Sequence, residues 1–169
     1  MAALGARGGR ARARVVPVGG VGDAAQGVVV GGARRDGGRA VAEVTCRTAG
    51  ARAAIEAIAR EVPDVLVGAG TVVTAAQVDE AVDAGARFLV SPGLSAAVVR
   101  RAQELGVPVV PGVATPSDVI AALDLGLDVV KLFPANVVGG PAAVKAFSAP
   151  FPGLRFVPTG GVSAANLLD

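Results

Sequence analysis

A lysine stands in the middle of an apolar run, in the stretch Asp128-Val-Val-Lys-Leu-Phe-Pro134. Because a strand alternates its faces, Lys131 would share one face with Val129 and Phe133. Burial disfavours the charged ammonium and lowers its pKa, which leaves a neutral amine that can attack carbonyl groups. The position of Lys131 therefore indicates Schiff-base chemistry. A plainer interpretation stays open, in which the lysine ends a strand and extends its ammonium into solvent.

A carboxylate and a guanidinium follow the same alternation in a second short run. Val41, Glu43 and Thr45 would share a face, and Arg47 continues that parity just beyond the run. Glu43 could move protons as the general acid/base of an imine pathway. Arg47 could hold a substrate carboxylate through two charge-assisted hydrogen bonds. On these residues alone, an ordinary ion pair between Glu43 and Arg47 is the simpler interpretation.

Three further runs end in glycine and small polar residues: Gly68-Ala-Gly-Thr71, Ser91-Pro-Gly93 and Pro158-Thr-Gly-Gly-Val162. Glycine lets a ligand approach the backbone, and the Thr71 hydroxyl could bind a carboxylate or carbonyl oxygen. The backbone amides of the Gly-Gly pair would suit an anion. Each of these endings also fits a plain turn between a strand and a helix.

The sequence contains no histidine and a single cysteine, Cys46. This excludes histidine triads and imidazole metal sites built from these residues, so proton transfer must come from carboxylates, lysine or water. One cysteine forms no internal disulfide. We interpret Cys46 as a small buried residue.

Strand and helix patterns alternate along the chain. Short β-branched runs begin at residues 15, 41, 65, 88, 107, 129 and 156, which are 19 to 27 residues apart. Helical patterns lie between them at 53–59, 75–84, 95–105 and 117–123, preceded or opened by the capping residues Thr74, Ser95 and Ser117. This alternation predicts a parallel sheet.

Three architectures share such an alternation. A leucine-rich solenoid would need fixed leucine and asparagine positions that are missing, and a doubly wound sheet would show G-x-G-x-x-G after its first strand. Polar residues after many different strands are typical of a (β/α)₈ barrel. Seven strands are expected and the sequence ends at Asp169, so we predict an incomplete barrel without its eighth strand. The glycines of 19–38 predict a weak first helix, since each costs up to about 1 kcal/mol relative to alanine.

Composition bounds the class of protein. The chain has 169 residues and is 52% hydrophobic, enough for one domain with a sizeable core. No apolar run approaches the roughly 20 residues of a membrane span, and we expect a cytoplasmic protein. Four arginines lie within residues 1–14, and the rest of the sequence has a formal charge of −2. We therefore interpret 1–14 as a disordered basic tail, 15–169 as the barrel domain, and expect neither nucleic acid nor membrane as a partner.

Taken together, the motifs stand in an order that closely resembles the 2-keto-3-deoxy-6-phosphogluconate (KDPG) aldolase family. These are class I aldolases, many of which also cleave 4-hydroxy-2-oxoglutarate (KHG). The motifs are Val15-Val-Pro-Val18, Glu43-Val-Thr-Cys-Arg-Thr48, Val67-Gly-Ala-Gly-Thr71, Val90-Ser-Pro-Gly93, Val110-Pro-Gly-Val-Ala-Thr-Pro116, Lys131-Leu-Phe-Pro134 and Pro158-Thr-Gly-Gly161.

The resemblance implies a role for each residue. Lys131 would form the pyruvate imine and Glu43 would shuttle protons. The remaining substrate contacts would be Arg47, Thr71 and Pro92 around the pyruvyl part, Phe133 as a pocket wall, and Thr159, Gly160 and Gly161 at the phosphate. The products would be pyruvate with glyceraldehyde 3-phosphate, or with glyoxylate from KHG. The resemblance further implies the Entner–Doudoroff pathway, a homotrimer, and no metal or other cofactor.

Two departures from the family pattern leave other functions open. The first is the glycine-rich stretch 19–38, where relatives carry a sturdier amphipathic helix, and the second lies at the other end of the sequence. The family continues past Asp169 with another strand and a Gly-Gly-Ser type turn whose serine helps to hold phosphate. One alternative is therefore a truncated, catalytically impaired barrel remnant. Another is a phosphate-binding barrel isomerase or epimerase, although such enzymes are expected to use metal or histidine. The choice between the gluconate-derived substrate, its galactonate epimer and KHG also stays open.

Overall fold

The computed structural model describes residues 15–163 and 166. The predicted basic tail, 1–14, lies outside these residues. The strands are β1 (Val18–Gly19), β2 (Val41–Thr45), β3 (Leu66–Gly70), β4 (Leu89–Val90), β5 (Val109–Val110), β6 (Gly112–Val113), β7 (Val129–Leu132) and β8 (Arg155–Pro158). The helices are α2 (Ala24–Asp36), α3 (Ala51–Glu61), α4 (Ala75–Asp83), α5 (Ala96–Glu104), α6 (Pro116–Asp124) and α7 (Gly140–Ser148).

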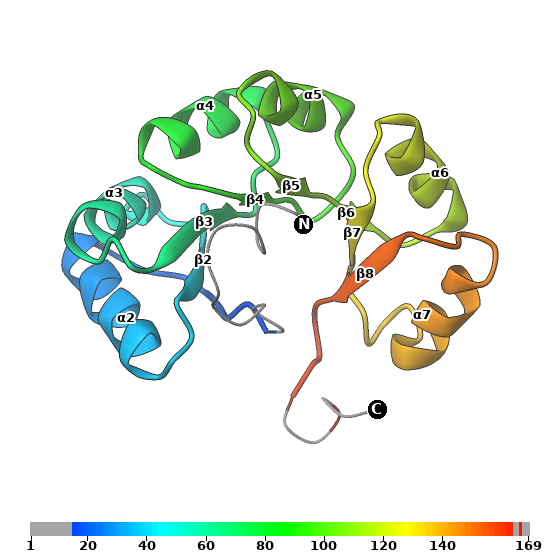
Figure 1. The fold of residues 1–169 in the computed structure, drawn as a ribbon, viewed down its shortest axis with the longest axis horizontal. Helices are drawn as coiled ribbons and strands as arrows, with labels where there is room; N and C mark the ends of the chain where they lie inside the picture. Colours follow the sequence, from blue (N-terminus) through cyan, green and yellow to red (C-terminus); the bar gives the residue numbers. More distant parts are fainter. Residues whose placement is uncertain (1–14, 164–165, 167–169) are drawn as a thin grey trace.

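All strand pairs are parallel, in the orders β1-β2-β3-β4-β5 and β6-β7-β8. Pro111 separates β5 from β6, because proline has no N–H to donate to the ladder. Its carbonyl still accepts a hydrogen bond of 2.8 Å from the Lys131 amide, so β5 and β6 together fill one strand position. The described strands thus occupy seven positions, as the spacing of the sequence predicts. They form an open arc with β1 and β8 at its ends, and the barrel is not closed (Figure 1).

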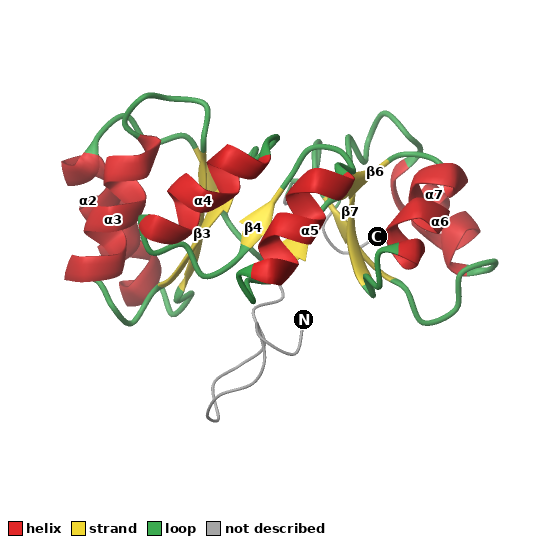
Figure 2. Cartoon of the chain, turned by 90° about the horizontal axis from the view of Figure 1, so that it is seen from above, coloured by secondary structure: helices red, strands yellow, loops and turns green. Residues whose placement is uncertain are grey.

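Apolar side chains fill both faces of this arc. On the outside, Val44 and Val67 join a large cluster with the inward faces of the helices. On the inside, Val41, Phe88 and Val90 form a smaller cluster. Figure 2 shows the helices along the outside of the strands, from α2 at one end to α6 and α7 at the other. Burial on both faces is the arrangement expected of parallel strands flanked by helices.

The glycine-rich helix α2 is longer than its composition predicts. It runs for 13 residues, and the Asp23 side chain caps its first turn by accepting from the Gln26 amide at 2.8 Å. A Cβ added at Gly27 would lie 3.0 Å from the backbone of Ala54 in α3, so glycine lets the two helices approach closely. Packing therefore offsets the poor helix propensity.

Helix caps follow the predicted positions in two helices and differ in a third. Thr74 and Ser95 cap α4 and α5, as predicted. The prediction of Ser117 for α6 is wrong, because Thr115 is the cap and Pro116 occupies the first helical position. Proline suits that position since its missing N–H would be unpaired there, and Asp118 completes a capping box with Thr115.

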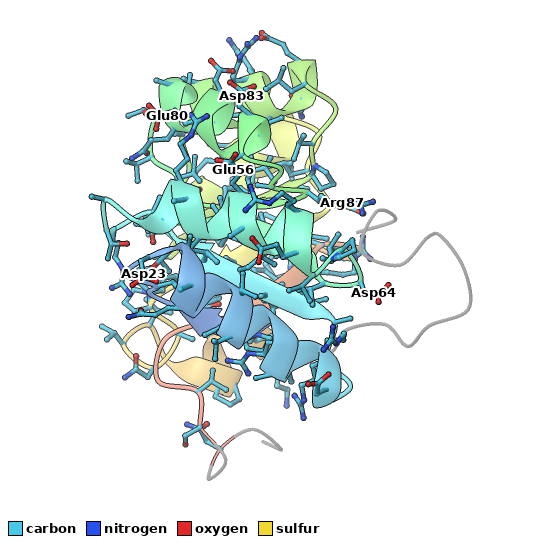
Figure 3. The ribbon with its side chains drawn as sticks, turned by 90° about the vertical axis from the view of Figure 1, so that its left-hand side faces the viewer. Asp23, Glu56, Asp64, Glu80, Asp83 and Arg87 are labelled. Atoms are coloured by element: carbon cyan, nitrogen blue, oxygen red, sulfur yellow. The ribbon has the colours of Figure 1, made fainter. Side chains whose placement is uncertain are left out.

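Charged side chains gather on the outer surface and at both ends of the strands. Figure 3 shows Glu80 and Asp83 on α4, with Asp64 and Arg87 at the opposite end of the strands from Asp23. Asp23 follows β1, whereas Asp64 and Arg87 precede strands, which marks the two ends of a parallel sheet. Within the described ranges, no helix is both long and apolar enough to cross a membrane.

Candidate active site

Lys131 lies on the inner face of β7 with only 7% of its surface exposed. Its neighbour Val130 points the other way, into the cluster under α6, which confirms the predicted alternation. The Lys131 Nζ stands 4.6 Å from the ring centroid of Phe133. Burial lowers the pKa of the Lys131 ammonium below its ordinary value, and the charge of Glu43 opposes part of that shift. The strand thus presents an amine that loses its proton more easily than a lysine in water.

Glu43 lies on the inner face of β2 and is 6% exposed. Burial raises the pKa of its carboxyl group, and the positive charge of Lys131 opposes part of the rise. The carboxylate lies against Gly70 of β3, where an added Cβ would be 2.8 Å from Cδ and 2.9 Å from Cγ of Glu43. Glycine at position 70 therefore makes the space that the carboxyl group occupies.

The polar heads of Lys131 and Glu43 face accessible space inside the arc. Neither head takes part in a side-chain hydrogen bond or ion pair with another described residue. In the described part of the chain, every fully buried side-chain nitrogen or oxygen has a hydrogen-bond partner, so these two heads are not fully buried. Both groups are therefore reachable by water or by a small ligand. A proton donor or acceptor with a raised pKa, beside an amine with a lowered one, is the pairing that imine chemistry requires.

Arg47 follows β2 and is exposed at the rim. Its Nε donates a hydrogen bond of 3.3 Å to Oγ1 of Thr45, and no carboxylate of a described residue forms an ion pair with it. The alternative of a Glu43–Arg47 ion pair is therefore wrong. Glu43 points into the arc while the guanidinium remains at its mouth.

Two more predicted residues lie at the ends of β3 and β4. Thr71 is half-buried and has a φ of 60°, the one positive φ among the described residues other than glycine. A β-branched side chain rarely adopts this conformation, and such strain gathers at functional sites. Pro92 is half-buried at the end of β4, and its carbonyl lies so close to Gly112 that a Cβ there would collide with it.

The loop after β8 contains Thr159, Gly160 and Gly161, the two glycines with φ of 92° and 80°. Hydrogen bonds fasten this loop to the segment that follows Lys131. The Ala135 amide donates to the Thr159 carbonyl at 2.7 Å, and the Asn136 amide donates to the Gly160 carbonyl at 3.1 Å. The loop therefore sits beside the end of β7, at the same end of the strands as Glu43 and Arg47.

Some features of the site were not predicted. The glycines of β3 were interpreted as room for a ligand, but a Cβ at Gly68 would collide with the Phe88 ring, and one at Gly70 with Glu43. The sequence signal for these contacts was the spacing of two residues between Gly68 and Gly70, which places both glycines on the inner face of β3. Asn136 was also missed, although its side chain lies against Gly161, with Nδ2 at 2.7 Å from the position of an added Cβ.

A hollow of about 200 Å³ lies outside this site, between the β2–α3 loop and α4. It is lined by residues that include Cys46, Arg52, Gln77 and Glu80, and it contains none of the predicted substrate-binding residues. Cys46 is half-buried against the outer core, and burial raises the pKa of its thiol. A thiol with a raised pKa is a weak nucleophile at neutral pH. The sequence predicts a small buried residue at Cys46, whereas the structure shows it only half-buried, packed against the outer core.

Comparison with known proteins decides the family. The family model described as KDPG and KHG aldolase matches residues 10–169. The chain belongs to this family. It is 44% identical over 158 residues to the 2-dehydro-3-deoxy-phosphogluconate aldolase of Treponema pallidum, covering 94% of this chain and 75% of that one. It is 46% identical over 145 residues to the KHG/KDPG aldolase of Escherichia coli K12, covering 86% and 65%.

The fold agrees with the family. The KDPG aldolase of Legionella pneumophila, solved with pyruvate captured at low pH as a covalent carbinolamine intermediate, superposes with a TM-score of 0.86 and 39% identity. That comparison covers 89% of this chain and 73% of the other. The chain thus spans about two thirds to three quarters of the length of the KDPG/KHG aldolases that it matches.

Proposed function

We propose that this chain is a Schiff-base aldolase, a lyase that cleaves KDPG into pyruvate and glyceraldehyde 3-phosphate. The observation that carries the proposal is the largely buried Lys131 amine, which faces the same interior as the Glu43 carboxyl group. Membership of the KDPG/KHG aldolase family supports the assignment. So does the covalent pyruvate adduct of the Legionella relative, because a carbinolamine is what an amine and a ketone form before water is lost.

The first half of the reaction builds the imine. The neutral Nζ of Lys131 attacks the C2 carbonyl carbon of the substrate and forms a carbinolamine. Protonation of its hydroxyl group lets water leave, and the C2–N bond becomes an iminium. The lowered pKa of Lys131 favours the attack, and the raised pKa of Glu43 favours transfer of a proton from its carboxyl group to the departing hydroxyl group.

The second half breaks the carbon–carbon bond. A base, the Glu43 carboxylate, takes the proton of the C4 hydroxyl group, and the C3–C4 electron pair moves into the iminium to give an enamine. The aldehyde leaves with C4 to C6. Glu43 then returns its proton to C3, which regenerates an iminium. Water hydrolyses this iminium to pyruvate and the free amine, and the proton released returns to Glu43. The iminium is the electron sink, so the scheme needs no metal or other cofactor.

The substrate would lie between the Arg47 side of the mouth and the loop after β8. Arg47, Thr71 and Pro92 would surround the C1 carboxylate and carbonyl end. Phe133, whose ring stands beside the amine, would form the wall. The phosphate would bind at the amides of Gly160 and Gly161 and at the Thr159 hydroxyl group, because backbone amides in left-handed turns form anion-binding concavities. KHG, which ends in a carboxylate, would use the same imine pathway.

We also propose that residues 15–169 constitute the aldolase domain, that three copies assemble as a homotrimer, and that the protein works in the cytoplasm within the Entner–Doudoroff pathway. The names of the relatives support the pathway assignment through their substrate. We propose neither nucleic acid nor membrane as a partner. Analytical ultracentrifugation would test the trimer.

The test of the function is reductive trapping. Incubation with pyruvate and borohydride should fix pyruvate on the peptide that contains Lys131, and peptide mass mapping reads the position. The sequence has one other lysine, the exposed Lys145 of α7, which provides a matched control. Lys131→Ala should abolish trapping and cleavage, and Lys145→Ala should retain both. Trapping on Lys145 alone, or turnover without Lys131, would overturn the proposal.

A further inference from the structure

Thr45 connects the end of β2 with the guanidinium at the mouth of the site. It is 3% exposed and lies on the same face of the strand as Glu43. Its Oγ1 accepts from Arg47 Nε at 3.3 Å and donates to the Gly19 carbonyl of β1 at 3.4 Å. A threonine hydroxyl group has one donor and can accept. The donor is therefore directed at β1, and the oxygen remains as an acceptor for Arg47.

This contact decides which nitrogens of Arg47 are free. A guanidinium can bind a carboxylate side-on through Nε and one terminal nitrogen, or end-on through both terminal nitrogens. Because Nε already donates to Thr45, the two terminal groups remain, and no carboxylate of the described residues pairs with them. The arrangement selects the end-on geometry.

We propose that Thr45 is a positioning residue that holds Arg47 so that its two terminal nitrogens receive the C1 carboxylate of the 2-oxo acid end-on. This inference rests on the proposed function, in which Arg47 binds that carboxylate. Thr45 acts through Arg47 and does not touch the substrate. A long arginine side chain loses much rotamer freedom when it binds, and an anchor on a buried strand residue reduces the freedom that remains to be lost.

The experiment compares Thr45→Val, which keeps the shape and removes the hydroxyl group, with Thr45→Ser, which keeps it. The measured quantity is the pyruvate concentration that gives half-maximal borohydride trapping on Lys131, together with KM and kcat for KDPG. Thr45→Val should raise the half-saturating concentration and KM by about 2- to 10-fold, the range of one hydrogen bond, and leave kcat nearly unchanged. Thr45→Ser should restore most of the loss. If the valine variant does not fold, Thr45→Ala, which adds no atoms, gives the same measurement.

A double variant separates positioning from a general structural effect. In an Arg47→Met background, Thr45→Val should have no further effect on the half-saturating concentration, because the group that it positions is gone. A full additional loss in that background, or an unchanged KM in folded Thr45→Val, would overturn the assignment of Thr45 while trapping in the unmodified chain still supported the aldolase. If the unmodified chain is not trapped by pyruvate, the proposed function fails, and the assignment of Thr45 fails with it.

Discussion

Gly70→Ala should displace the Glu43 carboxyl group without touching the lysine. The backbone at Gly70 does not have a positive φ, so alanine is allowed there and only the new methyl group matters. That methyl would lie 2.8 Å from Cδ and 2.9 Å from Cγ of Glu43, with one carboxylate oxygen nearer still. Carbon atoms rest about 3.5 to 4.0 Å apart. The carboxyl group must therefore move by roughly 1 Å, and a misplacement of that size can cost on the order of 10²-fold in rate.

The assay measures two steps in one protein. Cleavage of KDPG, followed by the release of pyruvate, should fall by about 10²-fold in Gly70→Ala. Borohydride trapping of pyruvate on Lys131 should remain measurable, since the methyl group contacts the carboxylate and not the amine that attacks pyruvate. A folded variant that cleaves KDPG at the rate of the unmodified chain would refute the argument, because the carboxylate would then not need its present position.

Two other glycines provide controls. Gly68 lies on the same strand as Gly70, and Gly68→Ala puts its methyl group into the ring of Phe88, which precedes β4. It should lower stability by about 1–3 kcal/mol through overpacking. Gly32→Ala in α2 meets no atom within 4 Å and should leave cleavage unchanged. Thermal unfolding of the three variants distinguishes loss of the fold from loss of the carboxylate position.

Two further predictions follow from the charges. Glu43→Gln should keep trapping measurable while it slows cleavage by roughly 10² to 10⁴. Because the Glu43 charge raises the pKa of Lys131, its removal should also shift the pH profile of trapping toward lower pH, and an upward shift would contradict the coupling. Asp118→Ala should cost about 1 kcal/mol of unfolding free energy at neutral pH, since the Asp118 carboxylate accepts from the Ala114 and Thr115 amides at 3.0 and 2.9 Å. These bonds lower the pKa of Asp118, so its contribution is present above the unfolded-state pKa and is lost as the pH falls through the folded-state value. Urea unfolding at pH 7 and near pH 3 should show the difference shrinking, and a constant difference would refute the assignment.

The inner face of the site could be predicted because strand alternation acts locally. Lys131 among valines, and Glu43 two residues from Thr45, needed only the period of two to be placed inward. That Lys131 and Glu43 face the same interior could not be derived from that period alone, since it depends on how the strands curve into an arc. The barrel motif and the family resemblance supplied that step.

What escaped prediction depends on contacts between distant residues. Each glycine of α2 taken alone lowers the helix propensity, and glycine at position 27 is explained only by the close approach of Ala54. Likewise, glycine at position 70 is explained only by its contact with Glu43, which lies 27 residues earlier in the sequence. The cap of α6 was misplaced for a local reason, because Thr115, Pro116 and Ser117 are adjacent and the proline decides which of them begins the helix.

At Thr71, selection for thermal stability and selection for turnover favour different residues, because the left-handed backbone there is strained for threonine. A β-branched residue held at a φ of 60° carries a cost of order 1–3 kcal/mol, which the surrounding structure must absorb. A laboratory selection for thermal stability alone would therefore favour glycine at this position, which adopts such a φ without penalty. That replacement would discard the hydroxyl group assigned to substrate binding. An engineer who wants a more robust aldolase should accordingly gain stability on the outer helices, at sites such as Gly32, and leave this strained residue in place.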